Sequence, residues 1–165
     1  MACVGTDLVG GDCLGPLVGQ LLVEGDAPAY VYGTLTSPVN ALNVVETGEF
    51  IRLTHPDRVV IAVDSAVGNK SEEGQIMVSG EPLRPGLALG KNLGNIGDIS
   101  LTVTTSYYAP DKKEFSLVRL GFIYSLAKRV AGLIMRCLHD TTNRLYDTLY
   151  SIDKECAIKN GTFLH

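Results

Sequence analysis

One stretch near the amino terminus, residues 4–25, constrains the fold more than any other. Its second half carries apolar side chains at i, i+3, i+4, i+7 and i+8, which is the spacing of one face of an α-helix. These side chains are Leu14, Leu17, Val18, Leu21 and Leu22. The first half instead places Asp7 and Asp12 among the glycines Gly5, Gly10, Gly11 and Gly15. A segment so polar and flexible does not pack in a core, so we expect it to cover an opening at the end of a sheet.

The composition fits one globular domain. The chain has 165 residues, of which 45 % are hydrophobic and 19 % are charged, and a domain of that size buries roughly two-thirds of its unfolded surface. We expect a single domain over residues 1–157 and a tail over residues 158–165. The longest apolar runs are far shorter than the roughly 20 residues that a membrane helix requires, so no membrane segment is expected.

Cysteines and charges narrow the class of protein. Cysteines at positions 3, 13, 137 and 156 show no CxxC spacing, which argues against a structural zinc site or a redox motif and favours free thiols in a reducing compartment. The amino terminus lacks the basic lead of a signal peptide, so we expect a cytoplasmic protein. The net charge of −4 and the lack of a basic cluster argue against nucleic acid as the main partner.

The rest of the sequence predicts further helices and strands. Besides the helix that ends at Gly25, helices are expected from the Ser37-Pro38 pair, from Ser116 to Leu138 and over about residues 142–157. Strands are expected over residues 1–4, 29–35, 59–64, 75–80 and 99–105, and residues 75–80 are placed at an edge because prolines follow. Residues 83–98 are rich in glycine and predict a long loop of the kind that is usually functional.

Two of the expected helices have assignable inner faces. The helix that starts at Ser37 should turn Leu42, Val45 and Phe50 inward. The long helix near the carboxyl terminus should pack through one stripe of side chains, namely Leu117, Leu120, Tyr124, Ala127, Ala131, Ile134 and Leu138. This helix and the Tyr107-Tyr108 pair would suit a dimer interface or a core equally well.

This order of elements predicts an α/β fold with a mostly parallel, doubly wound sheet. The carboxyl ends of parallel strands share one edge, and ligands of such folds bind in the crevice there. Asp12 follows the first strand, and Asp64 ends the strand over residues 59–64. Both carboxylates are therefore expected to face the same crevice.

Asp12 and Asp64 are the candidate catalytic residues. Two neighbouring carboxylates cannot both ionise at low cost, so one pKa rises and the pair can act as acid and base on a water, or can bind a divalent cation together. The alternative is that Asp12 caps a helix and Asp64 caps a turn. Asp7 and Asp98 are auxiliary candidates for the crevice, with turn or capping roles as their alternative.

Other motifs predict less. The glycines of the first loop do not match GxGxxG or GxxxxGK[ST], and two aspartates there would repel a phosphate. Cys13 lies at a helix start, where the pKa of a thiol can fall, but a nucleophile also needs a base. His55 belongs at the opposite edge of the sheet, His139 at a helix end and His165 at the terminus, so a buried or helix-start thiol is expected.

Four segments carry a family resemblance: GTDLVGGDCLGPLVG, VYGTLTSPVNALN, VVIAVDSAVG and LGKNLGNIGDISLT. Together they resemble the YyaC-type sporulation proteins of spore-forming bacteria over roughly residues 3–138. More distantly, GDCLGP and VVIAVD are similar to segments of the spore germination protease and of the hydrogenase maturation endopeptidases. The resemblance implies a three-layer α/β/α fold of the phosphorylase/hydrolase-like type.

The resemblance also implies roles for the two aspartates. The functional aspartates of the germination protease match Asp12 and Asp64, and the corresponding acidic residues of the maturation proteases bind nickel with a histidine from a later loop. This sequence has no histidine near that loop, where Asp98 is the nearest polar substitute.

Three functional hypotheses follow from these observations. The first is a cytoplasmic, sporulation-associated peptidase in which Asp12 and Asp64 activate water and residues 83–98 cover or select a peptide or protein substrate, with spore proteins as candidates. The second is a non-catalytic relative that binds a peptide or protein partner. The third is a metal-dependent hydrolase, although no cofactor is expected.

Overall fold

The computed structural model describes residues 1–86, 94–107 and 118–159. Within them lies a four-stranded sheet of order β1-β2-β4-β3. Its strands are β1 (Ala2–Cys3), β2 (Ile61–Gly68), β3 (Ile76–Ser79) and β4 (Ile99–Tyr107). β2 pairs in parallel with both β1 and β4, whereas β3 is an antiparallel edge strand. The mixed α/β class, the mostly parallel sheet and the outer position of β3 are thus confirmed.

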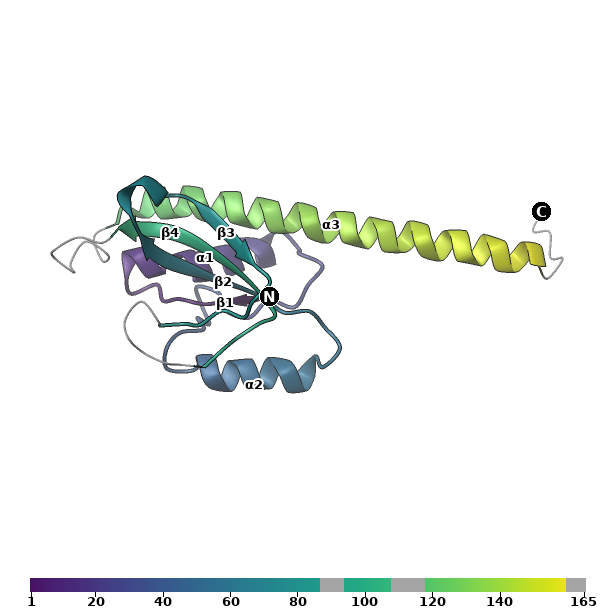
Figure 1. Ribbon diagram of the computed structural model, residues 1–165, viewed down its shortest axis with the longest axis horizontal. Coiled ribbons are helices and arrows are strands. Elements are labelled where there is room, and N and C mark those ends of the chain that lie inside the picture. Colours follow the sequence, from purple (N-terminus) through teal and green to yellow (C-terminus); the bar gives the residue numbers. More distant parts are fainter. Residues whose placement is uncertain (87–93, 108–117, 160–165) are drawn as a thin grey trace.

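Helices cover both faces of this sheet. The helices are α1 (Leu14–Glu24), α2 (Val44–Thr54) and α3 (Leu120–Lys159), with short 3₁₀ turns η1 (Gly10–Asp12) and η2 (Lys70–Glu72). Figure 1 shows α2 on one side of the sheet and α1 and α3 together on the other, with α3 extending well beyond the sheet. None of the helices in the described part of the chain has the length and apolar run needed to cross a membrane.

Two hydrophobic clusters follow this division. The larger one joins α1 and α3 to the β2 residue Val63 and to Leu101 and Val103 of β4. The smaller one joins α2 to Ala62 of β2 and to the start of the chain. Because neighbouring residues of a strand point to opposite faces, Ala62 and Val63 identify which face of β2 each following side chain occupies.

The prediction of a strand over residues 29–35 is wrong. This segment makes one isolated bridge, from Tyr32 to Ala2 of β1, and a second isolated bridge joins Val39, beyond the segment, to Val4. At Gly33, between them, φ is +92° and a Cβ would overlap the carbonyl oxygen of Cys3. The chain touches β1 with its backbone and turns away, so no continuous ladder forms.

A helix starting at Ser37 is also not observed. α2 begins at Val44, since the preceding residues form a turn in which the side chain of Asn43 accepts a hydrogen bond from the N–H of Asn40 at 2.8 Å. The inward face is correspondingly different. Leu42 is 90 % exposed, and the buried residues of α2 are Val44 and Ile51.

Near the carboxyl terminus, the two expected helices form the single helix α3. Its buried face follows the i, i+3, i+4 pattern from Ile123 to Ile134, so that Ala127 and Ala131 are buried as predicted but Leu120 and Tyr124 are exposed. Within the long segment 83–98, Leu83 pairs with Ile96. The predictions for Leu117 and Tyr108 and the middle of that segment, 87–93, lie outside the described residues.

Candidate functional site

Asp12 is held in place by the polar loop that follows β1. Gly5 has a φ of +144°, and a Cβ there would overlap the carbonyl oxygen of Asp12, so a residue with a side chain could not take this position without moving the loop. The N–H of Thr6 donates to the same carbonyl oxygen at 3.1 Å. The start of the loop, at Gly5 and Thr6, thus lies against the backbone of Asp12 at the end of η1.

The start of α1 lies directly on the backbone of the first strand. A Cβ at Gly15 would overlap the carbonyl oxygen of Val4. The N–H of Val4 in turn donates to the carbonyl oxygen of Val63 on β2 at 2.7 Å. Asp12 therefore lies close to the point where β1 ends beside β2.

Asp64 lies at that same point, although not at the end of its strand as predicted. It is the fourth residue of β2, which continues to Gly68. The last pair between β1 and β2 joins Cys3 to Val63. Asp64 is therefore the first residue of β2 that has no partner in β1. By strand alternation Asp64 shares the α2 face with Ala62, whereas Ser65 shares the opposite face with Val63.

Ser65 links the two carboxylates. Its hydroxyl donates to Oδ1 of Asp12 at 3.1 Å, and its backbone N–H donates to Oδ1 of Asp64 at 2.8 Å. The structure thus brings together the two aspartates that the sequence singled out. It adds Ser65, whose only sequence signal is its position directly after Asp64.

The electrostatics of the two aspartates are unequal. Burial raises the pKa of Asp64 well above its ordinary value, and the negative charge of Asp12 raises it further. The hydrogen bond from the Ser65 N–H lowers this pKa, but by less than the other two effects raise it. Burial also raises the pKa of Asp12, but bonds from the Ser65 hydroxyl and the Thr6 N–H oppose this. Burial and the charge of Asp12 thus favour the protonated form of Asp64, whereas two hydrogen bonds favour the ionised form of Asp12.

The raised pKa of Asp64 predicts how stability depends on pH. Between the ordinary carboxyl pKa and the raised one, the unfolded chain loses this proton while the folded chain keeps it, so stability falls as pH rises, by up to about 1.4 kcal/mol per pH unit. The side chain of an Asp64→Asn variant cannot ionise. In thermal melts we expect the variant to gain stability over wild type from acid to neutral pH. A gap that stays constant with pH would contradict this assignment.

Thr105 anchors η1 to the sheet from the neighbouring strand. Its buried hydroxyl on β4 donates to the carbonyl oxygen of Gly11 at 2.8 Å. Sequence reasoning did not single out this residue, because a threonine in an alternating strand has no distinctive pattern.

Substituting this anchor should weaken the fold. We expect Thr105→Val to lower the free energy of unfolding by about 1–3 kcal/mol, because it leaves the Gly11 carbonyl without its buried donor. The matched control is Ser106→Ala on the same strand, since the buried Ser106 hydroxyl has no hydrogen-bond partner among the described residues. Urea denaturation measures both, and an equal loss of stability in the two variants would contradict the anchoring role.

The other candidates lie apart from this pair or are not activated. Asp98 is exposed and accepts a hydrogen bond from the N–H of Val60 at 2.8 Å, which places it at the amino ends of β2 and β4 and away from the crevice. Asp7 is exposed in the first loop. Burial and the charges of Asp7 and Asp12 raise the pKa of Cys13, as expected for a thiol that is not a nucleophile.

The side chains that could bind a metal ion are few near the two aspartates. Across the described ranges, no group of three or more His, Cys, Asp or Glu side chains is placed to hold a metal ion. His55 follows α2, where its Nε2 lies 2.7 Å from the hydroxyl oxygen of Tyr32. Asp12 and Asp64 would be the ligands of any divalent cation here, with water to complete its coordination.

Comparison with known proteins places the chain in a family. The family model described as "Protein of unknown function (DUF1256)" matches residues 1–133. The chain belongs to this family. The chain is also 38 % identical over 102 residues to the "Uncharacterized protein YyaC" of Bacillus subtilis strain 168. The match covers 61 % of this chain and 50 % of that relative, so the chain spans about half of the relative's length. No solved structure matches it.

Proposed function

We propose that this DUF1256 protein is a sporulation-associated peptidase in which Asp12 and Asp64 activate a water for hydrolysis of a peptide bond. The observation that carries the proposal is the pair itself: two partly buried carboxyl groups linked through Ser65, with unequal affinities for a proton. An ionised and a protonated carboxyl group that both bond to Ser65 would supply the base and the acid that amide hydrolysis requires.

The roles follow from which carboxyl group holds the proton. Asp12 accepts a proton from water as the water oxygen bonds to the scissile carbonyl carbon, and Asp64 donates its proton to the oxygen that becomes negative. When the carbon–nitrogen bond breaks, the proton on Asp12 passes to the leaving amine and the hydroxyl proton of the intermediate returns to Asp64. Ser65 orients Asp12 through its hydrogen bond and is a positioning residue.

A three-layer fold is part of the same proposal. A three-layer α/β/α arrangement like that of the maturation proteases is supported by helices on both faces of a mostly parallel sheet. It is also supported by the position of the two aspartates beside the end of β1. Spore proteins in the cytoplasm are the proposed substrates, through the resemblance to the germination protease.

One observation favours the alternative, a non-catalytic protein that binds a peptide or protein partner. Strand alternation places Asp64 on the α2 face of β2, while Asp12 is bound by Ser65 on the opposite face. If the two carboxyl groups cannot reach one water, the crevice can bind but cannot hydrolyse.

The deciding experiment is incubation of the protein with candidate spore proteins, followed by mass spectrometry of the products. Cleavage at a defined bond is expected, and a chelator in a parallel sample separates the two-aspartate mechanism from a metal-dependent one. If the candidates bind but stay intact, the binding alternative holds instead.

A further inference from the structure

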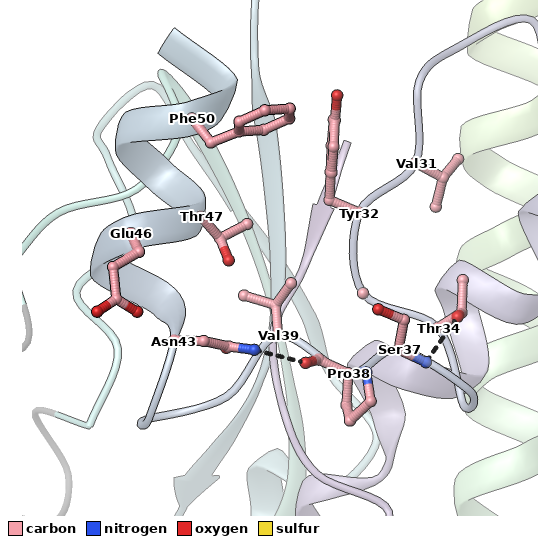
Figure 2. Close-up of a pocket in the computed structure, with 11 residues that line it drawn as sticks. Val31, Tyr32, Thr34, Ser37, Pro38, Val39, Asn43, Glu46, Thr47 and Phe50 are labelled. Carbon is pink, nitrogen blue, oxygen red and sulfur yellow. Dashed lines mark hydrogen bonds between the residues drawn. The ribbon is translucent and has the colours of Figure 1, made fainter. Parts of the chain in front are cut away.

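A pocket of about 430 Å³ lies between α2 and the segment that follows α1. It is within the size range of sites that bind small molecules or a few residues of a peptide. Figure 2 shows its two walls and its floor. Its lining includes Tyr32, Pro38, Val39, Asn43, Glu46 and Phe50.

Two aromatic rings form the mouth of this pocket. Tyr32 and Phe50 face each other edge to face, with ring centroids 6.0 Å apart, and Figure 2 shows them on opposite walls. The Tyr32 hydroxyl lies 2.7 Å from Nε2 of His55, which holds the ring in one orientation. Phe50 is 53 % exposed. A half-exposed aromatic ring beside a fixed one provides apolar area that a ligand could bury.

Two hydrogen bonds hold the floor and one wall of the pocket in place. The side-chain amide of Asn43 donates to the carbonyl oxygen of Pro38 at 3.1 Å and ties α2 to the opposite wall (Figure 2). The backbone of Val39, at the floor, accepts a hydrogen bond from the N–H of Gly5 at 2.8 Å. Little ordering would therefore be required when a ligand enters.

The charge of the lining is one-sided. Glu46 on α2 is the only Asp, Glu, Lys, Arg or His among the described residues that line the pocket, and it is exposed. A carboxylate beside the aromatic and aliphatic side chains of the lining attracts a basic group that is joined to an apolar one.

The pocket also shares a face and a loop with the candidate site. It lies on the α2 side of the sheet, and strand alternation places Asp64 on that side. Gly5, which bonds the floor residue Val39, is also the glycine that cradles the Asp12 carbonyl. A peptide seated here would lie on the same face of the sheet as Asp64.

We propose that this pocket is a recognition subsite for a peptide segment that packs an aromatic or large aliphatic side chain against the rings of Tyr32 and Phe50 and places a basic residue beside Glu46. The peptide nature of the occupant rests on the proposed function. Its apolar-then-basic pattern rests on the lining of the pocket.

The test measures binding apart from cleavage. The probe is an acetylated and amidated peptide in which a phenylalanine–lysine pair is flanked by glycines, titrated calorimetrically into the folded Asp64→Asn protein. Alanine in place of the phenylalanine should weaken binding about tenfold or more, as expected for the loss of one buried aromatic side chain. Glutamate in place of the lysine should weaken it a few-fold, and less at high salt.

Variants of the pocket locate the binding site. In the Asp64→Asn background, Phe50→Ala should weaken binding of the phenylalanine–lysine peptide about tenfold, and Glu46→Gln should remove the preference for lysine over glutamate. The matched control is Val45→Ala, on the same helix, outside the lining and 51 % exposed, which should bind as the parent does. Circular dichroism checks that each variant is folded.

Each outcome decides between the two proposals. No binding of any peptide, or binding that Phe50→Ala leaves unchanged, overturns the subsite. If the peptides bind with the expected preferences but wild-type protein cleaves none of the spore proteins, the subsite proposal is supported and the peptidase proposal is overturned. If wild type cleaves spore proteins and Phe50→Ala leaves the KM of this reaction unchanged, the peptidase proposal stands and the subsite proposal is overturned.

Discussion

Substitution of Asp64 by asparagine is expected to reduce the rate of peptide cleavage by about a thousandfold, within the range known for loss of a general acid or base. Asparagine keeps the size and the acceptor oxygen that binds the Ser65 N–H, but it has no proton to give to the scissile group. Mass spectrometry of spore proteins incubated with wild type and variant measures the effect. The variant should remain folded, because it replaces a carboxyl group that burial already favours in its neutral form.

The control for this experiment lies at the other edge of the sheet. Asp98→Asn also exchanges a carboxyl group for an amide and retains an oxygen for the Val60 N–H, so its cleavage rate should stay close to that of wild type. Asp12→Asn should lose as much activity as Asp64→Asn, because each step needs both groups. Robust cleavage by either site variant would remove the two-aspartate mechanism.

Gly15→Ala is expected to destabilise the protein by about 3 kcal/mol or more, at the upper end for overpacked substitutions. A Cβ at this position would overlap the carbonyl oxygen of Val4 and crowd the Val4 backbone. Relief requires α1 to move away from β1, which would separate the larger core cluster from the start of the sheet. Urea denaturation, or loss of the folded protein on expression, measures this effect.

A second glycine of a helix provides the comparison. At Gly132 in α3, the nearest neighbour that an added methyl group would meet is the flexible end of Arg136, at 3.8 Å. Gly132→Ala should therefore stabilise the protein, by up to about 1 kcal/mol, through helix propensity. If both alanine variants changed stability in the same direction, close packing of α1 on β1 would not be the reason for Gly15.

Local patterns predicted the elements whose own sequence decides their structure. The spacing from Leu14 to Leu22 predicts the helix face, and the pattern of residues 99–105 predicts the strand β4, although β4 is buried on both faces and its burial does not alternate. The predictions failed where a neighbouring element overrides the local pattern. Residues 29–35 have strand-forming side chains, yet the close approach of Gly33 to Cys3 limits their pairing to one isolated bridge.

The inner faces of α2 and α3 were predicted only in part for a related reason. A helix pattern leaves several stripes open when apolar residues are frequent, and only the partner surface selects one of them. In α3 the buried stripe starts at Ile123, whereas Leu120 and Tyr124, which fit the predicted stripe, are exposed.

For the candidate site, the sequence by itself determined the residue types and their order along the chain. Asp12 after a glycine-rich turn and Asp64 in a buried strand were both evident from the sequence, as was the rule that parallel strands share an edge. The tertiary structure alone decided which candidates meet. It joined Asp12 to Asp64 through Ser65 and placed Asp98 at the opposite edge. The physical reason is that hydrogen bonds and burial depend on distances between segments remote in sequence, whereas spacing along the chain reports only local periodicity.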